Sequence, residues 1–293
     1  MPRWQGKSRG TPLGYRIIIF VCTRLGILPA YILLRFIALY YFLFSWESSS
    51  HSYHYFRQRL GFGVFKSRVN VYRNYNVFAQ TLLDKLVVMA GIGNKFTYEF
   101  DGEENLRAMV KGGRGGILIS AHVGNWEAAG HLLKRLDTRI NVVMYDGEHE
   151  NIKQYLEEVT GGRNLRVIVI KEDLSHVFAI GEALHNNELV CLHADRFLEG
   201  NKTVTRNFLG APAKFPEGAF ILSATFNVPV SIVFAFKETS FHYHFYGSAV
   251  LQRTDSESKR EFVDRLIDSF VDQLQQKVQL YPEQWFNYYN FWE

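Results

Sequence analysis

Cysteines, sequence repeats and low-complexity tracts are scarce or absent in this chain, and each scarcity excludes a class of protein. Cys22 and Cys191 are the only cysteines among 293 residues, which excludes a disulfide-stapled secreted domain, and their separation gives no metal-ligand spacing. Their apolar surroundings are typical of reduced thiols and indicate a protein that faces the cytoplasm. No internal repeat, low-complexity tract or interdomain linker is found, and a hydrophobic content of 47% excludes a disordered chain.

Acidic residues are almost absent from the first 83 positions. Glu47 is the only one there, against eleven lysines and arginines, so this segment carries a net charge of +10 and the rest of the chain −6. A cationic apolar segment is attracted to anionic lipid head groups or to nucleic acid phosphates. The apolar content favours lipid, and we expect no nucleic acid partner.

The longest apolar run extends over residues 25–46 and reads LGILPAYILLRFIALYYFLFSW. At about 1.5 Å per helical residue it is long enough to cross a hydrocarbon core of about 30 Å. Arg35 stands near its middle, at a cost on the order of 3 kcal/mol that so apolar a helix tolerates. The run is therefore compatible with a single membrane span.

A helix lying in the membrane interface fits slightly better. A continuous helix from Arg16 onward would place Arg16, Arg24 and Arg35 within a sector of about 100°, although Pro29 argues against that continuity. A helix buried in the protein's own core is the third alternative. We expect residues 1–91 to form a basic, apolar, helical membrane-associating segment.

Two kinds of segment alternate along the remaining residues, 92–293. β-rich apolar runs are separated by segments of helical periodicity, which is typical of a mostly parallel central sheet sandwiched by helices, an α/β fold. The predicted strands are 97–100, 116–121, 140–145, 165–170, 188–194 and 228–236; the predicted helices are 105–110, 125–136, 176–187 and an amphipathic one over 262–278. The last thirteen residues contain seven aromatics, which indicates a tail docked on the core or an aromatic wall beside a lipid groove.

Polar residues crowd the end of one predicted core strand, where residues 120–127 read SAHVGNWE. In open α/β sheets, ligands bind beyond the carboxyl ends of strands, so His122 is predicted to lie in the binding crevice. Gly124 relaxes the turn and Asn125 is a good helix cap. Glu127 can then fold back towards His122, giving a histidine general base with an orienting acid.

No serine or cysteine with the sequence context of a nucleophile accompanies this pair. Ser120 lies on the same side of the strand as His122 but lacks a nucleophile-elbow context. The base is therefore expected to activate a hydroxyl or amine of a substrate.

Three later stretches occur in a defined order after SAHVGNWE: ELVCLHADRF at 188–197, KFPEGAF at 214–220 and NVPVSIVF at 227–234. With the first, they resemble the four sequence blocks of the lysophospholipid/glycerolipid acyltransferase superfamily. Those blocks are a histidine and an acid separated by four residues, a block that ends near an arginine, a proline-glutamate-glycine turn and a valine- and proline-rich strand. The whole chain, from WQGKSRG to PEQWF, looks more like the bacterial lipid A late-acyltransferase branch.

The resemblance implies a function and a set of site residues. It implies transfer of an acyl group from a thioester, acyl-carrier protein or coenzyme A, to a hydroxyl or amine of a membrane lipid, with no further cofactor and no metal. The enzyme would act at the cytoplasmic face of the bacterial inner membrane. His122 and Glu127 would be catalytic, and the substrate side would be lined by Asn125, Asp195, Arg196, Pro216, Glu217 and Gly218.

The expected electrostatic contacts follow from the same mechanism. Backbone amides of residues 123–125 and Arg196 are the candidate donors to the oxyanion. An acidic acyl-carrier protein would be received by basic residues such as Lys134, Arg135, Arg163 and Arg166.

The sequence departs from the family patterns at two positions. Enzymes that acylate glycerol phosphate typically have an arginine soon after the proline-glutamate-glycine turn, whereas Ala219, Phe220 and Ile221 follow here. This disfavours a glycerol-phosphate acceptor. The lipid A branch often has glutamine after the aspartate, where this chain has Arg196.

Two other functions are compatible with parts of the sequence. A metal-dependent hydrolase would use His122, His131, His193 and Asp195, of which the last two share one side of a strand. A non-catalytic lipid-binding membrane protein would account for the charge asymmetry and the aromatic tail. It would not account for the polar cluster at the strand ends.

Overall fold

The computed structural model describes residues 12–90, 95–125, 136–145, 165–171, 173–198 and 200–292. An N-terminal helical part precedes the sheet and consists of α1 (Pro12–Leu25), α2 (Ile27–Phe44), α3 (Trp46–His54), a π-helical turn (Tyr55–Arg59) and α4 (Val64–Ala90). The α/β part contains β1 (Thr97–Asp101), α5 (Glu103–Lys111), β2 (Gly116–Ser120), β3 (Ile140–Tyr145), β4 (Leu165–Ile170), α8 (Ser175–His185) and β5 (Leu189–His193). It continues with β6 (Thr203–Phe208), β7 (Ala211–Pro216), α9 (Gly218–Phe226), β8 (Val230–Thr239), β9 (His242–Gly247), α10 (Lys259–Leu280) and a 3-10 turn (Pro282–Gln284).

Seven strands form the central sheet in the order β1-β9-β8-β2-β5-β3-β4. Strands β8, β2, β5, β3 and β4 are parallel to one another, and β9 pairs antiparallel with β8 and parallel with β1. Every residue of β2 is buried, as expected for a strand covered on both faces. The predicted, mostly parallel α/β sheet is confirmed.

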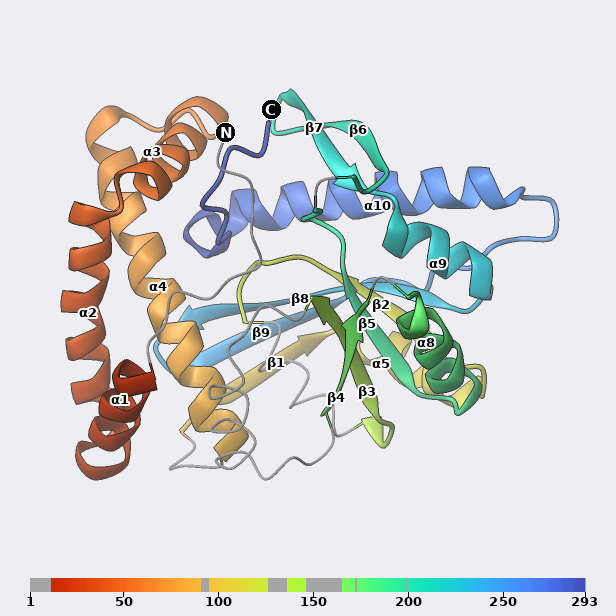
Figure 1. The fold of residues 1–293 in the computed structure, drawn as a ribbon, viewed down its shortest axis with the longest axis horizontal. Helices are drawn as coiled ribbons and strands as arrows, with labels where there is room; N and C mark the ends of the chain where they lie inside the picture. The colour runs from red at the N-terminus through yellow and green to blue at the C-terminus, as the bar shows by residue number, and fades with distance from the viewer. Residues whose placement is uncertain are drawn as a thin grey trace.

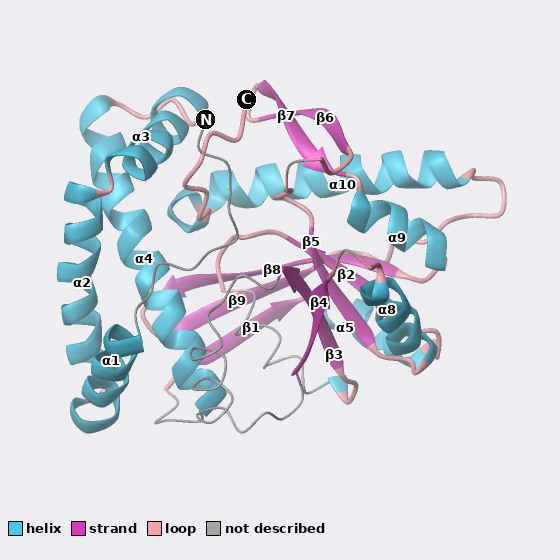
Figure 2. Cartoon of the chain, in the orientation of Figure 1, coloured by secondary structure: helices cyan, strands magenta, loops and turns pink. Residues whose placement is uncertain are grey.

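Helices cover both faces of this sheet (Figures 1 and 2). One face, with Ile117 and Ile119 of β2, packs against α8, α9 and α10. The opposite face, with Leu118, packs against α5, and its β8–β9 part packs against α4 and α2. In Figure 1, α10 runs across the first face, whereas α2 and α4 stand side by side at the β8–β9 end of the sheet.

The N-terminal helices bend at a glycine. Gly26 separates α1 from α2 with φ +93°, a conformation that favours glycine. Pro29 lies within the first turn of α2, where backbone N–H groups lack helical partners, so it is tolerated there. The predicted interruption is real, but it occurs three residues before the proline.

One core joins the N-terminal helices to the sheet. Ala38 of α2 and Phe56 of the π-helical turn belong to the same buried cluster as Ile119 of β2 and Phe270 of α10. Burial of apolar surface at about 25 cal/mol per Å² is the main stabilising contribution, and this core spans both regions. The helical segment and the α/β part therefore stabilise each other.

Candidate active site

Strand register brings the predicted histidine next to an aspartate 73 residues later. Ser120, the last residue of β2, pairs with His193, the last residue of β5, and His122 and Asp195 each lie two residues beyond the end of their strand. His122 and Asp195 therefore emerge at the same level and on the same face. Asp195 is buried at 1% exposure, whereas the His122 side chain is 25% exposed.

The carboxylate of Asp195 binds His122 twice. Its Oδ1 lies 2.7 Å from His122 Nδ1, and its Oδ2 accepts the backbone N–H of His122 at 3.0 Å. Burial alone would raise the pKa of Asp195, but the attraction and hydrogen bond of His122 and the charge of Arg196 outweigh it, so the pKa is well below its usual range. An ionised carboxylate at Nδ1 favours the imidazole tautomer in which Nδ1 carries the hydrogen.

A second imidazole stacks on His122. The ring centroids of His122 and His193 are 4.5 Å apart. Burial, with smaller contributions from the charges of His122 and Arg196, holds the pKa of His193 well below its ordinary value. His193 is therefore neutral, and it packs against the catalytic ring without adding a competing charge.

Backbone hydrogen bonds hold the turn that follows His122. Gly124 has φ +56°, and a Cβ there would lie 1.8 Å from the carbonyl oxygen of Ala235, so only glycine fits. The amides of Val123, Gly124 and Asn125 donate to Ala121 at 2.8 Å, to Gln284 at 2.8 Å and to Ala235 at 2.8 Å. The prediction that these three amides bind an oxyanion is therefore wrong, since each already donates within the protein.

The C-terminal segment wraps around this turn. Phe286 N–H donates to the His122 carbonyl at 3.2 Å, and Trp285 forms a β-bridge with Val123. Arg196 donates from Nη2 to the Phe286 carbonyl at 2.5 Å, and its charge helps to lower the pKa of Asp195. The tail is thus docked on the site itself. The sequence signal for this was the aromatic ending, whose position in the fold could not be deduced.

Several of the other predicted site residues lie outside the described residues, and others contact parts of the fold other than the His122 side chain. Glu127 lies outside the described residues, as do Lys134, Arg135 and Arg163. Arg166 lies 3.8 Å from Glu182. The side chain of Asn125 is buried and donates to Thr81 and Tyr243.

The proline-glutamate-glycine motif forms a separate junction, between β7 and α9. Pro216 ends β7, Gly218 begins α9, and Glu217 between them pairs with Arg260 of α10 at 3.0 Å. Glu217 therefore helps to fasten α10, and its predicted contact with substrate stays a prediction.

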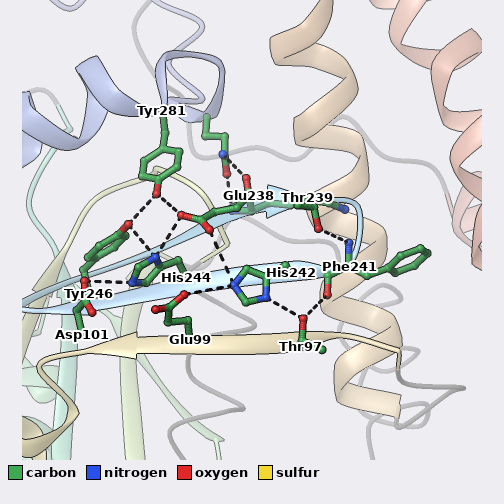
Figure 3. A network of polar contacts seen from close by, with 12 residues as sticks. Thr97, Glu99, Asp101, Glu238, Thr239, Phe241, His242, His244, Tyr246 and Tyr281 are labelled. Carbon is green, nitrogen blue, oxygen red and sulfur yellow. Dashed lines mark hydrogen bonds and ion pairs between the residues drawn. The ribbon is translucent and has the colours of Figure 1, made fainter.

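Metal-ligating side chains come together elsewhere. In the described part of the chain, the group that could share one ion is Glu99, Asp101 and His244, whose ligand atoms lie within 4.8 Å of one another. Figure 3 shows this group at the β1–β9 edge, where His244 contacts Asp101 at 3.1 Å and Glu238 at 3.2 Å. The predicted hydrolase set differs from this group, and its His131 lies outside the described residues.

An apolar cavity lies on the face of the sheet that carries His122. Its walls include Leu118, Ser120, Val142, Cys191, Val233 and Ala235. Ser120 precedes His122 by two residues, so both side chains point to this face. Burial raises the pKa of Cys191 to about 12, so its thiol stays protonated and unreactive.

The fold and site define an open α/β protein in which a buried carboxylate holds a partly exposed histidine beside an apolar cavity. The family model for bacterial lipid A biosynthesis acyltransferases matches residues 71–293. The chain belongs to this family.

Two curated relatives are the phosphatidylinositol mannoside acyltransferases of Mycobacterium tuberculosis strains H37Rv and CDC 1551. Each is 29% identical over 118 residues, which is 40% of this chain and 37% of the relative, so the match spans little more than a third of their length. Among solved structures, the 1-acyl-sn-glycerophosphate acyltransferase PlsC of Thermotoga maritima is similar with a TM-score of 0.38 and 14% identity. That match covers 85% of this chain and 97% of the other.

Proposed function

We propose that this protein transfers a fatty acyl group from a thioester directly to a hydroxyl or amine of a membrane lipid, with His122 as the general base. Family membership supports the acyl transfer. The observation that carries the assignment of the base is the 2.7 Å contact between His122 Nδ1 and Asp195 Oδ1. A buried anion that binds both the ring and the backbone of one histidine fixes its rotamer and favours its protonated form after proton transfer.

The reaction has two proton transfers. His122 Nε2 removes the proton of the acceptor hydroxyl, whose oxygen attacks the thioester carbonyl carbon and forms the new C–O bond. The C–S bond then breaks, and the imidazolium returns its proton to the departing thiolate. The products are an ester and a free thiol, and Asp195 stays ionised throughout. An amine acceptor follows the same course and loses one proton.

Arg196 is the remaining candidate for stabilising the oxyanion, because the amides of residues 123–125 donate within the turn. The inert thiol of Cys191 supports direct transfer, since a protonated buried cysteine is a poor nucleophile. As the motif resemblance implies, Glu127 would pair with His122 and, together with Asp195, orient its ring.

The apolar cavity is proposed to receive the part of the acyl chain next to the thioester carbonyl. It adjoins Ser120, one strand repeat before His122, so a thioester carbonyl near Nε2 could extend its chain under β2. The lining is hydrocarbon-rich, with Leu118, Val142 and Val233 among its walls. Fatty chains gain free energy there by leaving water.

The N-terminal helices are the proposed membrane-binding surface. α2 is 18 residues long with mean hydropathy 1.9, long and apolar enough to span a bilayer by composition. Its inner stripe, with Tyr31 and Leu34, is buried, while Ile32 and Phe36 are 55% and 66% exposed. This outward apolar face supports a monotopic helix at the cytoplasmic face of the inner membrane, with its basic residues at the head groups.

Lipid profiling tests the proposed function. Cells with and without the protein should differ by one acylated lipid, and the purified protein should form that lipid from labelled acyl-carrier protein or acyl-coenzyme A thioester. The mass difference identifies both acceptor and chain. If neither thioester labels any lipid and both profiles are identical, the proposal is wrong.

A further inference from the structure

A buried ion pair lies between the N-terminal helices and the sheet. Lys237 Nζ of β8 lies 2.5 Å from Asp84 Oδ2 of α4, and both side chains are almost fully buried, at 5% and 0% exposure. Tyr31 of α2 donates to Asp84 Oδ1 at 2.5 Å and accepts from Lys237 at 2.8 Å. A buried carboxylate without such partners would be strongly unfavourable, and here both oxygens of Asp84 have one.

Tyr243 connects the ion pair to the catalytic turn. Its hydroxyl donates a short hydrogen bond to Asp84 Oδ2. Because a hydroxyl has one hydrogen, the oxygen of Tyr243 is then an acceptor, and it receives Asn125 Nδ2 at 3.2 Å. The direction of donation therefore runs from Asn125 through Tyr243 to Asp84.

Asn125 is bound to α4 at a second point. Its Nδ2 also donates to the carbonyl of Thr81 at 3.1 Å, one helical turn before Asp84. Its backbone N–H donates to Ala235 of β8 at 2.8 Å. Asn125 follows His122 by three residues, so its side chain and backbone together hold the turn against both α4 and the sheet.

We propose that Tyr243, supported by Asp84, is a positioning residue for acyl transfer: it holds Asn125, and through Asn125 it holds His122 at the angle the reaction needs. This inference rests on the proposed function. It assigns Asn125 to the turn, in addition to the substrate contact that the sequence predicted. It also links α2 and α4, the proposed membrane-binding helices, to the catalytic base through one buried chain of hydrogen bonds.

Steady-state kinetics of Tyr243→Phe, Asn125→Ala and the double variant test the proposal with purified full-length protein. Each single variant should lower kcat about tenfold and leave KM for the thioester within about twofold, because misplacing the base affects the reaction step more than donor binding. The double variant should lose no more than Asn125→Ala alone, since Tyr243 acts through Asn125. A double variant whose reduction in kcat is the product of the two single reductions would overturn the proposal. A Tyr243→Phe enzyme with unchanged kcat per folded molecule would overturn it too.

Ser231→Ala is the matched control. Ser231 of β8 is fully buried, as Tyr243 of β9 is, and Ser231→Ala removes the hydrogen bond that its hydroxyl donates to the Ser248 carbonyl at 3.0 Å. Ser231 lies at the start of β8, whereas Lys237 of the ion pair lies near the end of that strand. Ser231→Ala should reduce thermal stability as Tyr243→Phe does while kcat stays within about twofold of wild type. A kcat loss in Ser231→Ala equal to that in Tyr243→Phe would mean that general destabilisation accounts for both.

A spectroscopic readout separates this inference from the proposed function. In ¹⁵N-histidine-labelled protein, the ring resonances of His122, assigned with His122→Ala, should shift in Tyr243→Phe and in Asn125→Ala but not in Ser231→Ala. This result is expected even if no thioester is a substrate. Unshifted His122 resonances in both variants would contradict the positioning role while leaving the transfer reaction intact.

Discussion

At the scale of single residues, Asp195 contributes two restraints to one histidine. It accepts the backbone N–H of His122 at 3.0 Å and faces the ring Nδ1 at 2.7 Å. The first restraint fixes the position of the histidine backbone after the strand, and the second fixes which ring nitrogen carries the hydrogen. The ring of His193 packs on the ring of His122 and stays neutral.

Asp195→Asn should lower kcat by roughly a hundredfold or more, because an amide neither favours the imidazolium nor selects one tautomer. Transfer of a labelled acyl group under saturating donor measures the effect. Asp255→Asn, on an exposed loop, is the matched control and should retain wild-type activity. Wild-type kcat in Asp195→Asn would exclude Asp195 from the catalytic pair.

The same residue predicts how stability depends on pH. Its pKa is lowered in the folded protein, so it contributes stability above its unfolded pKa of about 3.9, and that contribution is lost as the pH falls towards the folded value. The difference in unfolding free energy between wild type and Asp195→Asn should therefore narrow as the pH falls below about 5. Urea unfolding at several pH values measures this difference. A difference that widened in acid would contradict the lowered pKa.

The histidine could be predicted from sequence, and its aspartate partner could not. His122 follows an apolar run and precedes a glycine and a helix cap, which are local signals. Asp195 was assigned by resemblance to the substrate side, and only the pairing of Ser120 with His193 aligns it with His122. Strand register is set by packing of the whole sheet and is not encoded in any short stretch.

At the scale of structural elements, the turn between β2 and the next segment leaves no room for a side chain. Gly124→Ala should destabilise the protein by several kcal/mol and abolish activity, because its Cβ would overlap the Ala235 carbonyl. Gly113→Ala is the matched control: it has φ +68° but open space around its Cβ, so it should cost only about 1 kcal/mol of backbone strain. Thermal unfolding measures both variants. Equal losses would show that backbone strain, rather than the overlap, is responsible.

Most of the elements that the sequence predicted are present in the structure, whereas three strands were not predicted. Strands β1 to β5 and β8 and helices α5, α8 and α10 lie where alternating apolar runs and helical periodicity placed them. The β6–β7 hairpin and β9 were missed. Strand β9 lies between β1 and β8 and reads HYHFYG. Its buried residues are Tyr243 and Phe245, and the histidines and tyrosine around them obscure the alternation of apolar and polar residues that marks a strand.

At the scale of the whole molecule, charge and apolar surface are concentrated at the same end. The first 83 residues carry +10, and the outward face of α2 exposes Ile32 and Phe36. Anionic lipid would attract this end and then bury its apolar face. The buried Asp84–Lys237 pair joins α4 to β8, and Asn125 of the turn after β2 donates to the Thr81 carbonyl of the same helix.

The double variant Ile32→Gln/Phe36→Gln should weaken membrane binding by about a hundredfold, because each side chain contributes about 1.5 kcal/mol when it leaves water. Flotation with vesicles of phosphatidylethanolamine and phosphatidylglycerol measures this. Val167→Gln/Phe178→Gln removes two equally apolar, exposed side chains on the α/β part and should not change binding. If both double variants float alike, α2 is not the membrane-binding surface.

The most direct test of the account is the rate of acyl transfer by His122→Ala beside His185→Ala, which removes an exposed histidine of α8. Purified proteins would be given labelled acyl thioester and the lipid acceptor identified by profiling. Loss of the general base should lower kcat about a thousandfold or more, with His185→Ala indistinguishable from wild type. Transfer by His122→Ala at the wild-type rate would contradict the assignment of His122 as the catalytic base.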